Sequence, residues 1–257
     1  MKVATWNVNS LRARMPRFLA WLDETEPDVV CIQETKLRSD SFPRLQLEQL
    51  GYESADFGQG QWNGVAVISR VGMSDPILGI EHSGELEEAR AITVSCNGVV
   101  IVSVYVPNGR ALDSDHYRYK LQWLSHLREH LDKLFKPSDP VVVAGDFNVA
   151  PEDKDVWSPE ALIDCTHVSE PERDAFRSLI DWGLSDALRH FYDQDQIFTW
   201  WDHRAGAFHK RQGMRIDHIL VTEPIESKLN WAIVDRNARK GEKPSDHAPV
   251  LIDFSTP

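Results

Sequence analysis

The sequence has few cysteines and no long apolar run. Its three cysteines, Cys31, Cys96 and Cys165, lack the paired spacing of zinc ligands, and an odd, sparse count fits a reducing compartment. We therefore expect neither disulfide bonds nor a structural zinc. No apolar stretch approaches the ~20 residues that cross a bilayer, and residues 1–6 lead into strand-like sequence without a signal region. These absences predict a cytoplasmic protein with no membrane association.

Basic residues are outnumbered by acidic ones. The chain has 28 lysines and arginines against 40 aspartates and glutamates, which gives a net charge of −12. Because nucleic-acid-binding proteins usually carry a basic surface, this balance alone argues against that class. The charges are unevenly placed, however, with acids gathered in 81–88 and 153–174. An acidic protein with a basic rim around one pocket is compatible with a polyanionic substrate, and a mixed solvated surface is the alternative.

The expected basic rim consists of residues that flank the polar segments described below. Its members are Arg12, Arg14, Arg17, Lys36, Arg38, Arg110, Arg204, Lys210, Arg211 and Arg215.

No glycine, serine or proline linker divides the 257 residues, and no repeat is present. A chain of this length can bury a large core and still form one domain, so we expect a single domain over residues 1–257. Apolar periodicity predicts strands at 2–8, 28–32, 65–69, 91–95, 99–105, 141–144, 215–221 and 249–254, and helices at 16–25, 113–135 and 173–182. Hairpin-linked strands interleaved with helices predict two mixed β-sheets packed face to face, with helices outside.

Local signals refine three of these elements. Asn97-Gly98 lies between apolar runs and predicts a tight hairpin, since both residues tolerate positive φ. Pro16 suits the first turn of its helix. His126 and His130 have metal-ligand spacing within 113–135, but we expect them on a solvated face. The apolar stripe of that helix is Tyr117, Leu121, Leu124, Leu131 and Leu134.

Four short segments carry most of the polar chemistry: 5–9, 33–36, 145–148 and 245–247. Three of them follow predicted buried strands, and α/β proteins build polar sites at strand ends on a rigid apolar base. Carboxylates buried there without partners would be costly, so a cation must meet them. We expect a divalent metal that prefers oxygen ligands.

The residue types in these segments suit phosphodiester hydrolysis, which requires an activated water, a metal and a stabilised leaving oxygen. Asp146 is the candidate for water activation, and it would face the same side as Asn148 in an extended segment. His247 could bind a phosphoryl oxygen as a cation or transfer a proton. The candidate metal ligands are Asn7, Glu34, Asp146, Asn148, Asp246 and His247. Purely structural alternatives are a turn at Asp146, a helix cap at Asn7 and an edge-strand acid at Asp217.

Six segments recur in one known family in the same order. They are the segment around Asn7, 33–36, 105–109, 145–148, 215–218 and 243–247. They closely resemble the exonuclease III family of apurinic/apyrimidinic endonucleases, part of the broader endonuclease/exonuclease/phosphatase superfamily. The resemblance extends from Met1 to about Phe254. It implies an α/β, DNase I-like fold: a four-layered sandwich of two packed mixed β-sheets flanked by helices.

The resemblance also implies an activity. It is Mg²⁺-dependent hydrolysis 5′ to abasic sites in double-stranded DNA, with 3′–5′ exonuclease and 3′-phosphatase activities, in base excision repair. We expect Mn²⁺ to substitute for Mg²⁺. The expected partners are double-stranded DNA with abasic sites or blocked 3′ ends, bound by a monomer in the bacterial cytosol or nucleoid.

Catalytic roles are carried over from the family residue by residue. The family's catalytic positions match Tyr105, Asp146, Asn148, Asp217 and His247. Glu34 resembles the principal metal ligand, with Asp246 and either Asn7 or Asn9 nearby. Asn9 stands where some relatives carry an acid. By the same resemblance, Asp146 is the water activator or leaving-group acid, and Asp217 orients His247.

DNA contacts are carried over in the same way. Trp200 and Met214 align with the apolar pocket that receives an extruded abasic sugar and excludes nucleotides that keep their base. The loop 110–119 and Met214 depart from better-known relatives, which leaves the balance of endonuclease and exonuclease open. The residues expected to contact DNA are Asn7, Asn9, Arg12, Lys36, Asn108, Arg110, Trp200, Arg204 and Met214.

Two other functions are compatible with parts of the sequence. A superfamily phosphodiesterase could act on a lipid or an RNA tail, which the net charge of −12 would suit. A catalytically weak nucleic-acid-binding regulator would have lost the metal-binding acids, whereas Glu34, Asp146 and Asp246 are all present. Faster cleavage of a lipid phosphodiester than of abasic DNA would support the superfamily phosphodiesterase. Binding of RNA without metal-dependent cleavage would support the regulator.

Overall fold

The computed structural model describes residues 1–80 and 88–256. The acid-rich stretch 81–88 therefore lies outside the described residues except for Glu88. Two six-stranded sheets form the centre of the molecule. The first contains, in spatial order, β13 (Leu229–Val234), β14 (Val250–Phe254), β1 (Lys2–Asn7), β2 (Val29–Gln33), β4 (Val65–Ser69) and β3 (Glu53–Phe57). The second contains β5 (Ile77–Leu78), β6 (Ala91–Cys96), β7 (Val99–Tyr105), β8 (Val141–Asp146), β12 (Asp217–Thr222) and β9 (Leu184–Asp186).

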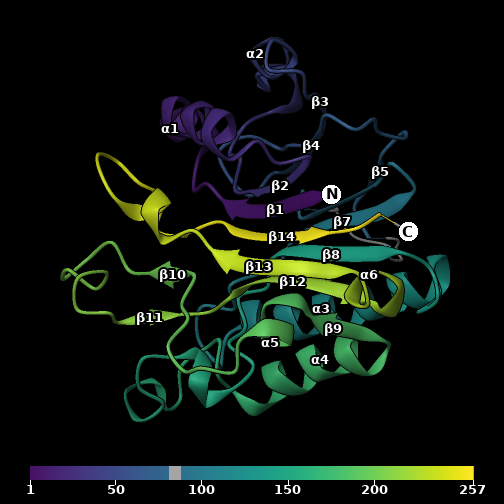
Figure 1. Cartoon of the computed structure of the whole chain (residues 1–257). Helices are drawn as coiled ribbons and strands as arrows, with labels where there is room; N and C mark the ends of the chain where they lie inside the picture. The colour runs from purple at the N-terminus through teal and green to yellow at the C-terminus, as the bar shows by residue number, and fades with distance from the viewer. Residues whose placement is uncertain (81–87, 257) are drawn as a thin grey trace.

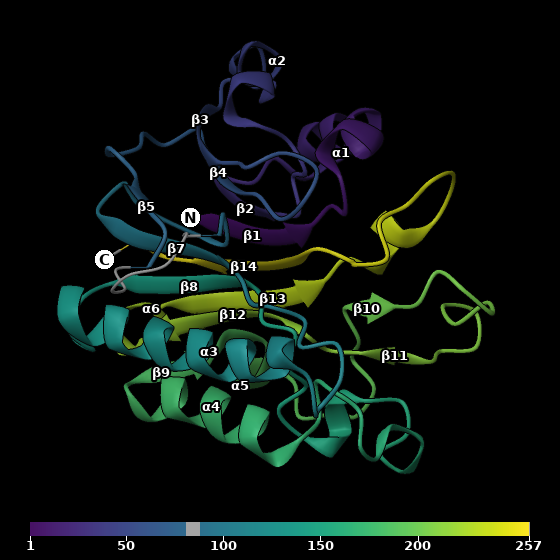
Figure 2. The same ribbon diagram turned by 180° about the vertical axis from the view of Figure 1, so that it is seen from behind.

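Helices cover the outer faces of the two sheets (Figures 1 and 2). Over the first sheet lie α1 (Leu11–Thr25) and α2 (Arg44–Glu48), and over the second lie α3 (Asp115–Leu134) and α4 (Glu170–Asp181). Shorter helices, α5 (Ala187–Phe191) and α6 (Glu223–Glu226), lie beside β12 and β9. The order helix, sheet, sheet, helix confirms the predicted four-layered α/β sandwich.

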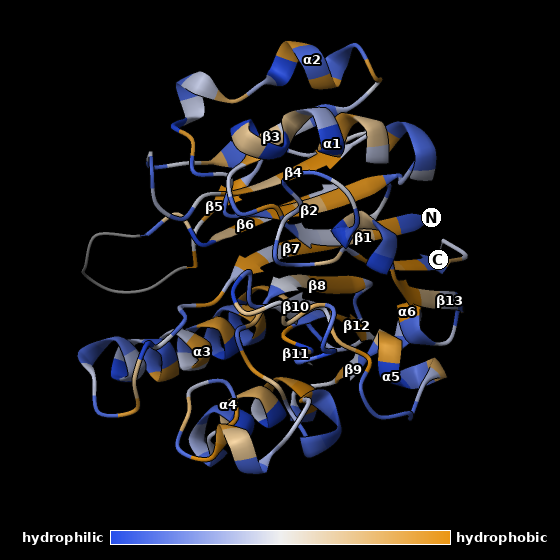
Figure 3. Ribbon diagram, turned by 90° about the vertical axis from the view of Figure 1, so that its left-hand side faces the viewer, coloured by the Kyte–Doolittle hydropathy of each residue, from blue (hydrophilic) through white to orange (hydrophobic). Residues whose placement is uncertain are grey.

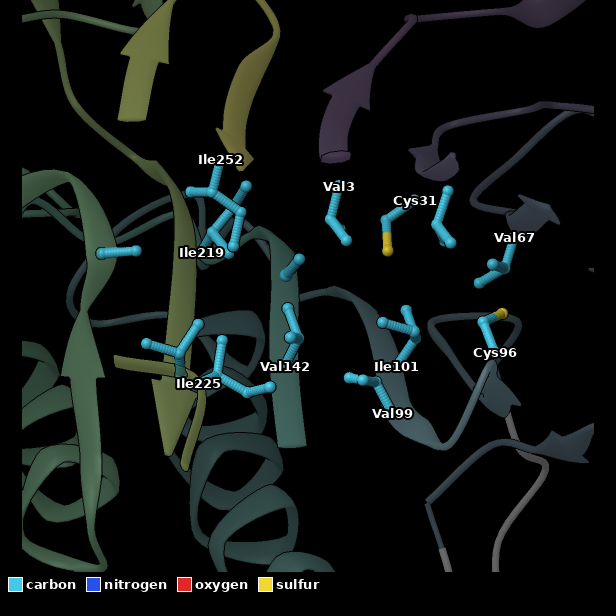
Figure 4. Packing of buried hydrophobic residues seen from close by; sticks show 14 of the residues in the cluster. Val3, Cys31, Val67, Cys96, Val99, Ile101, Val142, Ile219, Ile225 and Ile252 are labelled. Atoms are coloured by element: carbon cyan, nitrogen blue, oxygen red, sulfur yellow. The ribbon is translucent and has the colours of Figure 1, made fainter. Parts of the chain in front are cut away.

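Three apolar layers hold these four layers together. Between the sheets, Val3 and Cys31 face Ile101 and other aliphatic residues of the second sheet (Figure 4). A second cluster packs Phe18 of α1 against the first sheet, and a third packs α3 and α4 against the second. Because both faces of each sheet are covered, the central strands are apolar almost throughout, as the hydropathy colours show (Figure 3).

Most sequence-based elements lie where they were expected. The Asn97-Gly98 hairpin is confirmed, because Cys96 pairs with Val99 and both turn residues have positive φ, 48° and 81°. The helix expected at 16–25 begins earlier, at Leu11, so Pro16 lies inside it instead of in its first turn. Proline has no N–H, so Pro16 cannot donate the helical hydrogen bond to the carbonyl of Arg12, four residues earlier. Both Pro16 and Arg12 are exposed.

The apolar face of α3 differs from the expected stripe. His130 is buried, so its placement on a solvated face was wrong, whereas His126 is partly exposed. Leu134 is 37% exposed and does not belong to the core. Trp123 and Leu127 take part instead, because the helix packs against both the second sheet and α4 and so buries a wider face than one stripe.

The pairing directions bring several strand ends to one edge. β1 and β2 run parallel, with Asn7 opposite Gln33, and β7 and β8 run parallel, with Tyr105 opposite Asp146. All other neighbouring strands in the two sheets are antiparallel. A separate hairpin, β10 (Trp200–Trp201) and β11 (Gly213–Met214), projects beyond this region (Figure 1). None of the described helices is long and apolar enough to cross a membrane.

Candidate active site

Strand register places three polar side chains in a row on the second sheet. Asp146, the last residue of β8, pairs with Tyr105 on one side and with Asp217 on the other. On the first sheet, Asn7 ends β1, and Glu34 directly follows β2. Since the sheets pack face to face, these five residues meet at one end of the sandwich.

Asn7 links the two sheets. Its Nδ2 donates hydrogen bonds to Glu34 Oε1 and to Asp146 Oδ2, both over 2.9 Å. Lys36 Nζ lies 2.7 Å from Glu34 Oε2 and donates to Asn9 Oδ1 over 2.5 Å. The Asn7 amide thus holds the carboxylates of Glu34 and Asp146 close together, and the Lys36 ammonium offsets the charge of Glu34 alone.

Glu34, Asp146 and His247 form a cluster whose ligand-capable atoms lie within 4.8 Å of one another. Burial, together with the nearby acid Asp217, raises the pKa of Asp146 to about 7 against the opposing charge of His247. The cluster thus brings carboxylate oxygens from both sheets together in a mostly buried site. The paired oxygen donors of Glu34 and Asp146 therefore fit a hard divalent cation.

His247 is held by Asp217. Its Nδ1 lies 2.9 Å from Asp217 Oδ2, and its Nε2 lies 3.9 Å from Asp146 Oδ2. Burial alone would lower the pKa of His247, but the negative charges around it, Asp217 first, raise the pKa to about 10. At neutral pH the ring is a buried cation whose Nε2 points to Asp146.

Asp246 lies on the adjoining side of the site. Its Oδ1 accepts a hydrogen bond from Asn9 Nδ2 over 3.0 Å, and its Oδ2 accepts from Trp200 Nε1 over 3.1 Å. Burial opposes its ionisation, but the neighbouring His247 charge and these hydrogen bonds lower the pKa of Asp246 to about 2. Asp246 is ionised near neutral pH, although it falls outside the tight cluster of Glu34, Asp146 and His247.

The sequence predicted Asn148 in an extended segment with Asp146. In the structure Asn148 does not continue the strand. It has a φ of 51°, so it turns away from the strand direction, and its own N–H donates to Asp146 Oδ1 over 2.9 Å. Its Nδ2 donates to the Val106 carbonyl over 2.9 Å. Asn148 and Asp146 therefore lie side by side through a turn rather than through strand periodicity.

Sequence reasoning missed His167. Its Nε2 lies 3.0 Å from Asn148 Oδ1 and 3.1 Å from Asn108 Nδ2, so the ring borders the site. Burial and the nearby charge of Lys120 lower the pKa of His167 well below its ordinary value, which keeps the ring neutral. His167 follows no strand and belongs to no recognised motif, and it lies in a stretch noted only for its acids. Nothing local in the sequence marks it.

Tyr105 stands beside the carboxylates. Burial raises the pKa of its hydroxyl well above the ordinary value, and Glu34 and Asp146 add to the shift. The guanidinium of Arg90 lies 4.9 Å from the centre of its ring. Tyr105 thus keeps its proton and can act as a hydrogen-bond donor within the site.

The residues expected at the abasic-sugar pocket lie together. Trp200 pairs with Met214 across the β10–β11 hairpin and forms an isolated bridge with His247. Met214 and His167 line a cavity of about 480 Å³ that Arg110 also borders. His167, in the lining of this cavity, contacts Asn148, whose N–H bonds Asp146.

The remaining expected DNA contacts differ in exposure. Arg12, Asn108, Arg110 and Arg204 are exposed, and Lys36 is half-buried. Arg204 pairs with Asp202, with 2.9 Å between Nη2 and Oδ2.

Three further arginines of the expected basic rim, Arg14, Arg17 and Arg215, bond to groups distant in the chain or to backbone carbonyls. Arg215 is only 1% exposed and binds Asp155 and Asp186. Arg14 donates to the Asn9 carbonyl, and Arg17 to carbonyls of 238–242. Sequence position alone could not distinguish these guanidinium groups from surface ones.

Known proteins are similar to this chain in sequence and fold. A family model described as the Endonuclease/Exonuclease/phosphatase family matches residues 4–247. An exodeoxyribonuclease of Bacillus subtilis is 33% identical over 255 residues, which cover 98% of each chain. The structure of the 3′ phosphatase NExo from Neisseria, bound to a product DNA hairpin, is 39% identical with a TM-score of 0.96 over 99% of both chains. An AP endonuclease structure from Archaeoglobus fulgidus is 36% identical with a TM-score of 0.96 over 100% of both chains.

The fold and the site together define a metal-dependent phosphodiester hydrolase. The chain belongs to the endonuclease/exonuclease/phosphatase family, within it to the branch of exonuclease III and the AP endonucleases. It is accordingly a DNA repair nuclease, as the sequence resemblance implied.

Proposed function

We propose that this nuclease hydrolyses phosphodiesters of double-stranded DNA in a Mg²⁺-dependent reaction, 5′ to abasic sites and at blocked 3′ ends, with Mn²⁺ able to replace Mg²⁺. The observation that carries the proposal is the cluster of Glu34, Asp146 and His247 within 4.8 Å. Carboxylates beside a protonated imidazole provide both a cation site and a donor for a phosphate oxygen.

The chain's own residues divide the chemistry. A bound divalent cation supplies charge stabilisation at the scissile phosphate and promotes ionisation of water. We assign it to Glu34 and Asp146, with Asp246 at the adjoining position. His247 is protonated, so it donates to a phosphate oxygen through Nε2 while Asp217 holds Nδ1.

Proton transfer falls to Asp146. Its buried carboxyl lies 3.9 Å from His247 Nε2, and burial raises its pKa in the metal-free protein, so it is suited to take a proton from water and to return one to the leaving oxygen. The neutral hydroxyl of Tyr105 and the amide of Asn148 can donate to the non-bridging oxygens as charge develops on them.

His167 favours 3′-end processing over incision at abasic sites. Its ring lies against Asn148 and lines the same cavity as Met214, where an extruded sugar would enter. A ring at this place narrows the route for an internal, extruded sugar, whereas a terminal 3′ phosphate needs no such extrusion. Relatives described as a 3′ phosphatase and a 3′–5′ exonuclease, each 39% identical, agree with this preference.

End-labelled duplexes test both statements. One carries an abasic-site analogue, one a 3′ phosphate and one is undamaged; each is incubated with the protein in Mg²⁺ and in EDTA. We expect Mg²⁺-dependent removal of the 3′ phosphate to be faster than incision at the abasic site. His167→Ala should raise abasic incision relative to 3′-phosphate removal, and His190→Ala, at an exposed histidine on α5, should leave the ratio unchanged. No cleavage of any duplex by folded protein would refute the function.

We further propose that the chain acts as one domain and as a monomer in the bacterial cytosol or nucleoid. In support, the cluster between the sheets draws on residues from Val3 to Phe254, so the two sheets share one core. Sedimentation of the protein with and without a DNA duplex tests the monomer.

A further inference from the structure

A buried ion pair lies directly behind the asparagines of the active site. Lys120, on α3, and Glu172, on α4, bond to each other, and both side chains are 0% exposed. Lys120 Nζ also donates to the backbone carbonyl of Asn148 over 2.6 Å and to that of Asn108 over 3.3 Å. The ammonium thus fixes the two backbone segments whose amide side chains face the site.

Glu172 extends the same arrangement to His167. Its Oε1, which binds Lys120, also accepts from the His167 N–H over 2.9 Å. Its Oε2 accepts from the Ser169 N–H over 3.1 Å as part of the capping box of α4. One carboxylate therefore connects the helix start, the His167 backbone and the ammonium.

The bonded segments have backbone conformations that need such support. Asn148 and His167 have φ values of 51° and 80°, in a backbone region that residues other than glycine rarely adopt. Gly109, in the Asn108 segment, leaves room for Lys120: a Cβ there would come within 3.1 Å of the lysine Cδ. The three segments converge on one ion pair, which no single helix or strand could achieve.

Stability alone does not explain an ion pair at this place. A buried pair is often no more stabilising than apolar residues of similar volume, because desolvation opposes the attraction. An apolar pair, however, could not bond the Asn148 carbonyl, the Asn108 carbonyl and the His167 N–H. What the charged pair adds is the placement of these three segments.

We propose that Lys120 and Glu172 are positioning residues for the nuclease reaction. They hold the backbones of Asn108, Asn148 and His167. The two side-chain amides and the imidazole are thereby correctly positioned for the substrate phosphate. The inference rests on the proposed function and identifies two residues that act on the phosphate through others. Their loss is expected to lower kcat more than it raises KM.

The test compares wild type, Lys120→Met with Glu172→Gln, Asn148→Ala, and the triple variant, all on the 3′-phosphate duplex. Replacing both charges leaves neither one stranded, and Leu131→Ala, a buried α3 position away from the site, is a control for destabilisation. We expect the paired substitution to lower kcat roughly 10- to 100-fold with KM within about 3-fold. The paired substitution should slow Asn148→Ala by a smaller factor than it slows the wild type, because part of its effect passes through the Asn148 side chain.

Losses that multiply in the triple variant, or an equal loss of kcat in Leu131→Ala, would overturn the proposal. Amide hydrogen exchange at Asn148 and His167 gives a readout that needs no activity. Exchange there should quicken in the paired variant relative to Leu131→Ala, and equal exchange would also overturn the inference. Failure of the wild type to cleave refutes the proposed function, which separates that result from failure of the positioning role.

Discussion

Asn7 Nδ2 and Asp146 Oδ2 lie 2.9 Å apart, although 139 positions separate the two residues in the chain and each belongs to a different sheet. The same nitrogen bonds Glu34, so one amide spans the two carboxylates to which we assign cation binding and proton transfer. The site is therefore a property of the contact between the sheets, and neither sheet alone contains it.

Removing either central carboxylate should abolish cleavage in a folded protein. Glu34→Gln and Asp146→Asn keep side-chain size and hydrogen bonding but remove the charge that the cation and the proton transfer require. We expect losses of about 10²-fold or more in kcat for each, measured on the 3′-phosphate duplex, with unchanged far-UV circular dichroism. Glu48→Gln, an exposed position on α2, is the matched control. Wild-type turnover by either folded variant would contradict the assignment.

Divalent metal should stabilise the protein through the same carboxylates. Binding to the native state alone raises the free energy of unfolding by about 1 to 3 kcal/mol when Mg²⁺ is present at 10 to 100 times its Kd. Thermal denaturation in EDTA and in Mg²⁺ measures the shift. Glu34→Gln should lose it, and Asp202→Asn, which removes an exposed-loop acid beside Arg204, should keep it. An equal shift in both variants would place the metal elsewhere.

His247 makes the stability of the metal-free protein depend on pH. Folding raises the pKa of its imidazole from 6.5 to about 10, so its stabilising contribution is complete below 6.5 and is lost as pH rises through 10. Between pH 8 and 10, above the pKa of Asp146, this loss should approach about 1 kcal/mol per pH unit. Chemical denaturation in EDTA should show a flatter profile for His247→Asn and an unchanged one for His190→Asn. A wild-type profile that is flat over this range would disprove the raised pKa.

DNA affinity should depend steeply on salt despite the acidic net charge. Arg12, Arg110 and Arg204 are exposed, and each phosphate contact releases about 0.9 counterion. Substituting any one with alanine should lower the slope of log K against log salt by roughly 1. Arg177→Ala, at an exposed arginine on α4 that is not among the expected DNA contacts, is the control. A slope that none of the three substitutions alters would discredit these contacts.

Arg215 should matter for stability. It is 1% exposed and binds Asp155 and Asp186, so Arg215→Met leaves two buried acids short of their partner. Breaking such a pair costs about 3 to 5 kcal/mol, measured by urea denaturation. Arg204→Met, at an exposed position, should cost far less. Equal effects of the two substitutions would mean that the buried network is not formed in solution.

Much of the fold could be predicted from the sequence because the apolar runs of the strands and the residues of the turns were clear signals. Apolar runs such as Val141–Ala144 and the Asn97-Gly98 turn carry local signals, and the strands and hairpin lie where those signals place them. The start of α1 was missed because Asn9 and Ser10 form its entry turn with positive φ and no side-chain cap, which no sequence rule indicates.

Part of the site was predictable because polar residues lie at the ends of apolar strands. Glu34, Asp146 and Asp217 lie at such ends, and register alone brings Asp146 beside Asp217. His167 and Lys120 could not be found in this way, because their places depend on contacts among α3, α4 and the turn after β8. Long-range packing decides those positions, and local periodicity carries no information about it.

The placement of β14 has a consequence for synthesis of the enzyme. This strand inserts between β1 and β13, and the turn before it carries Asp246 and His247. A nascent chain therefore exposes Glu34 and Asp146 long before the histidine and the strand that anchors it emerge from the ribosome. Until then β13 has no neighbouring strand in the first sheet, and the site lacks the imidazole to which we assign the phosphate contact. A nascent chain from which β14 has not yet emerged therefore lacks the complete site.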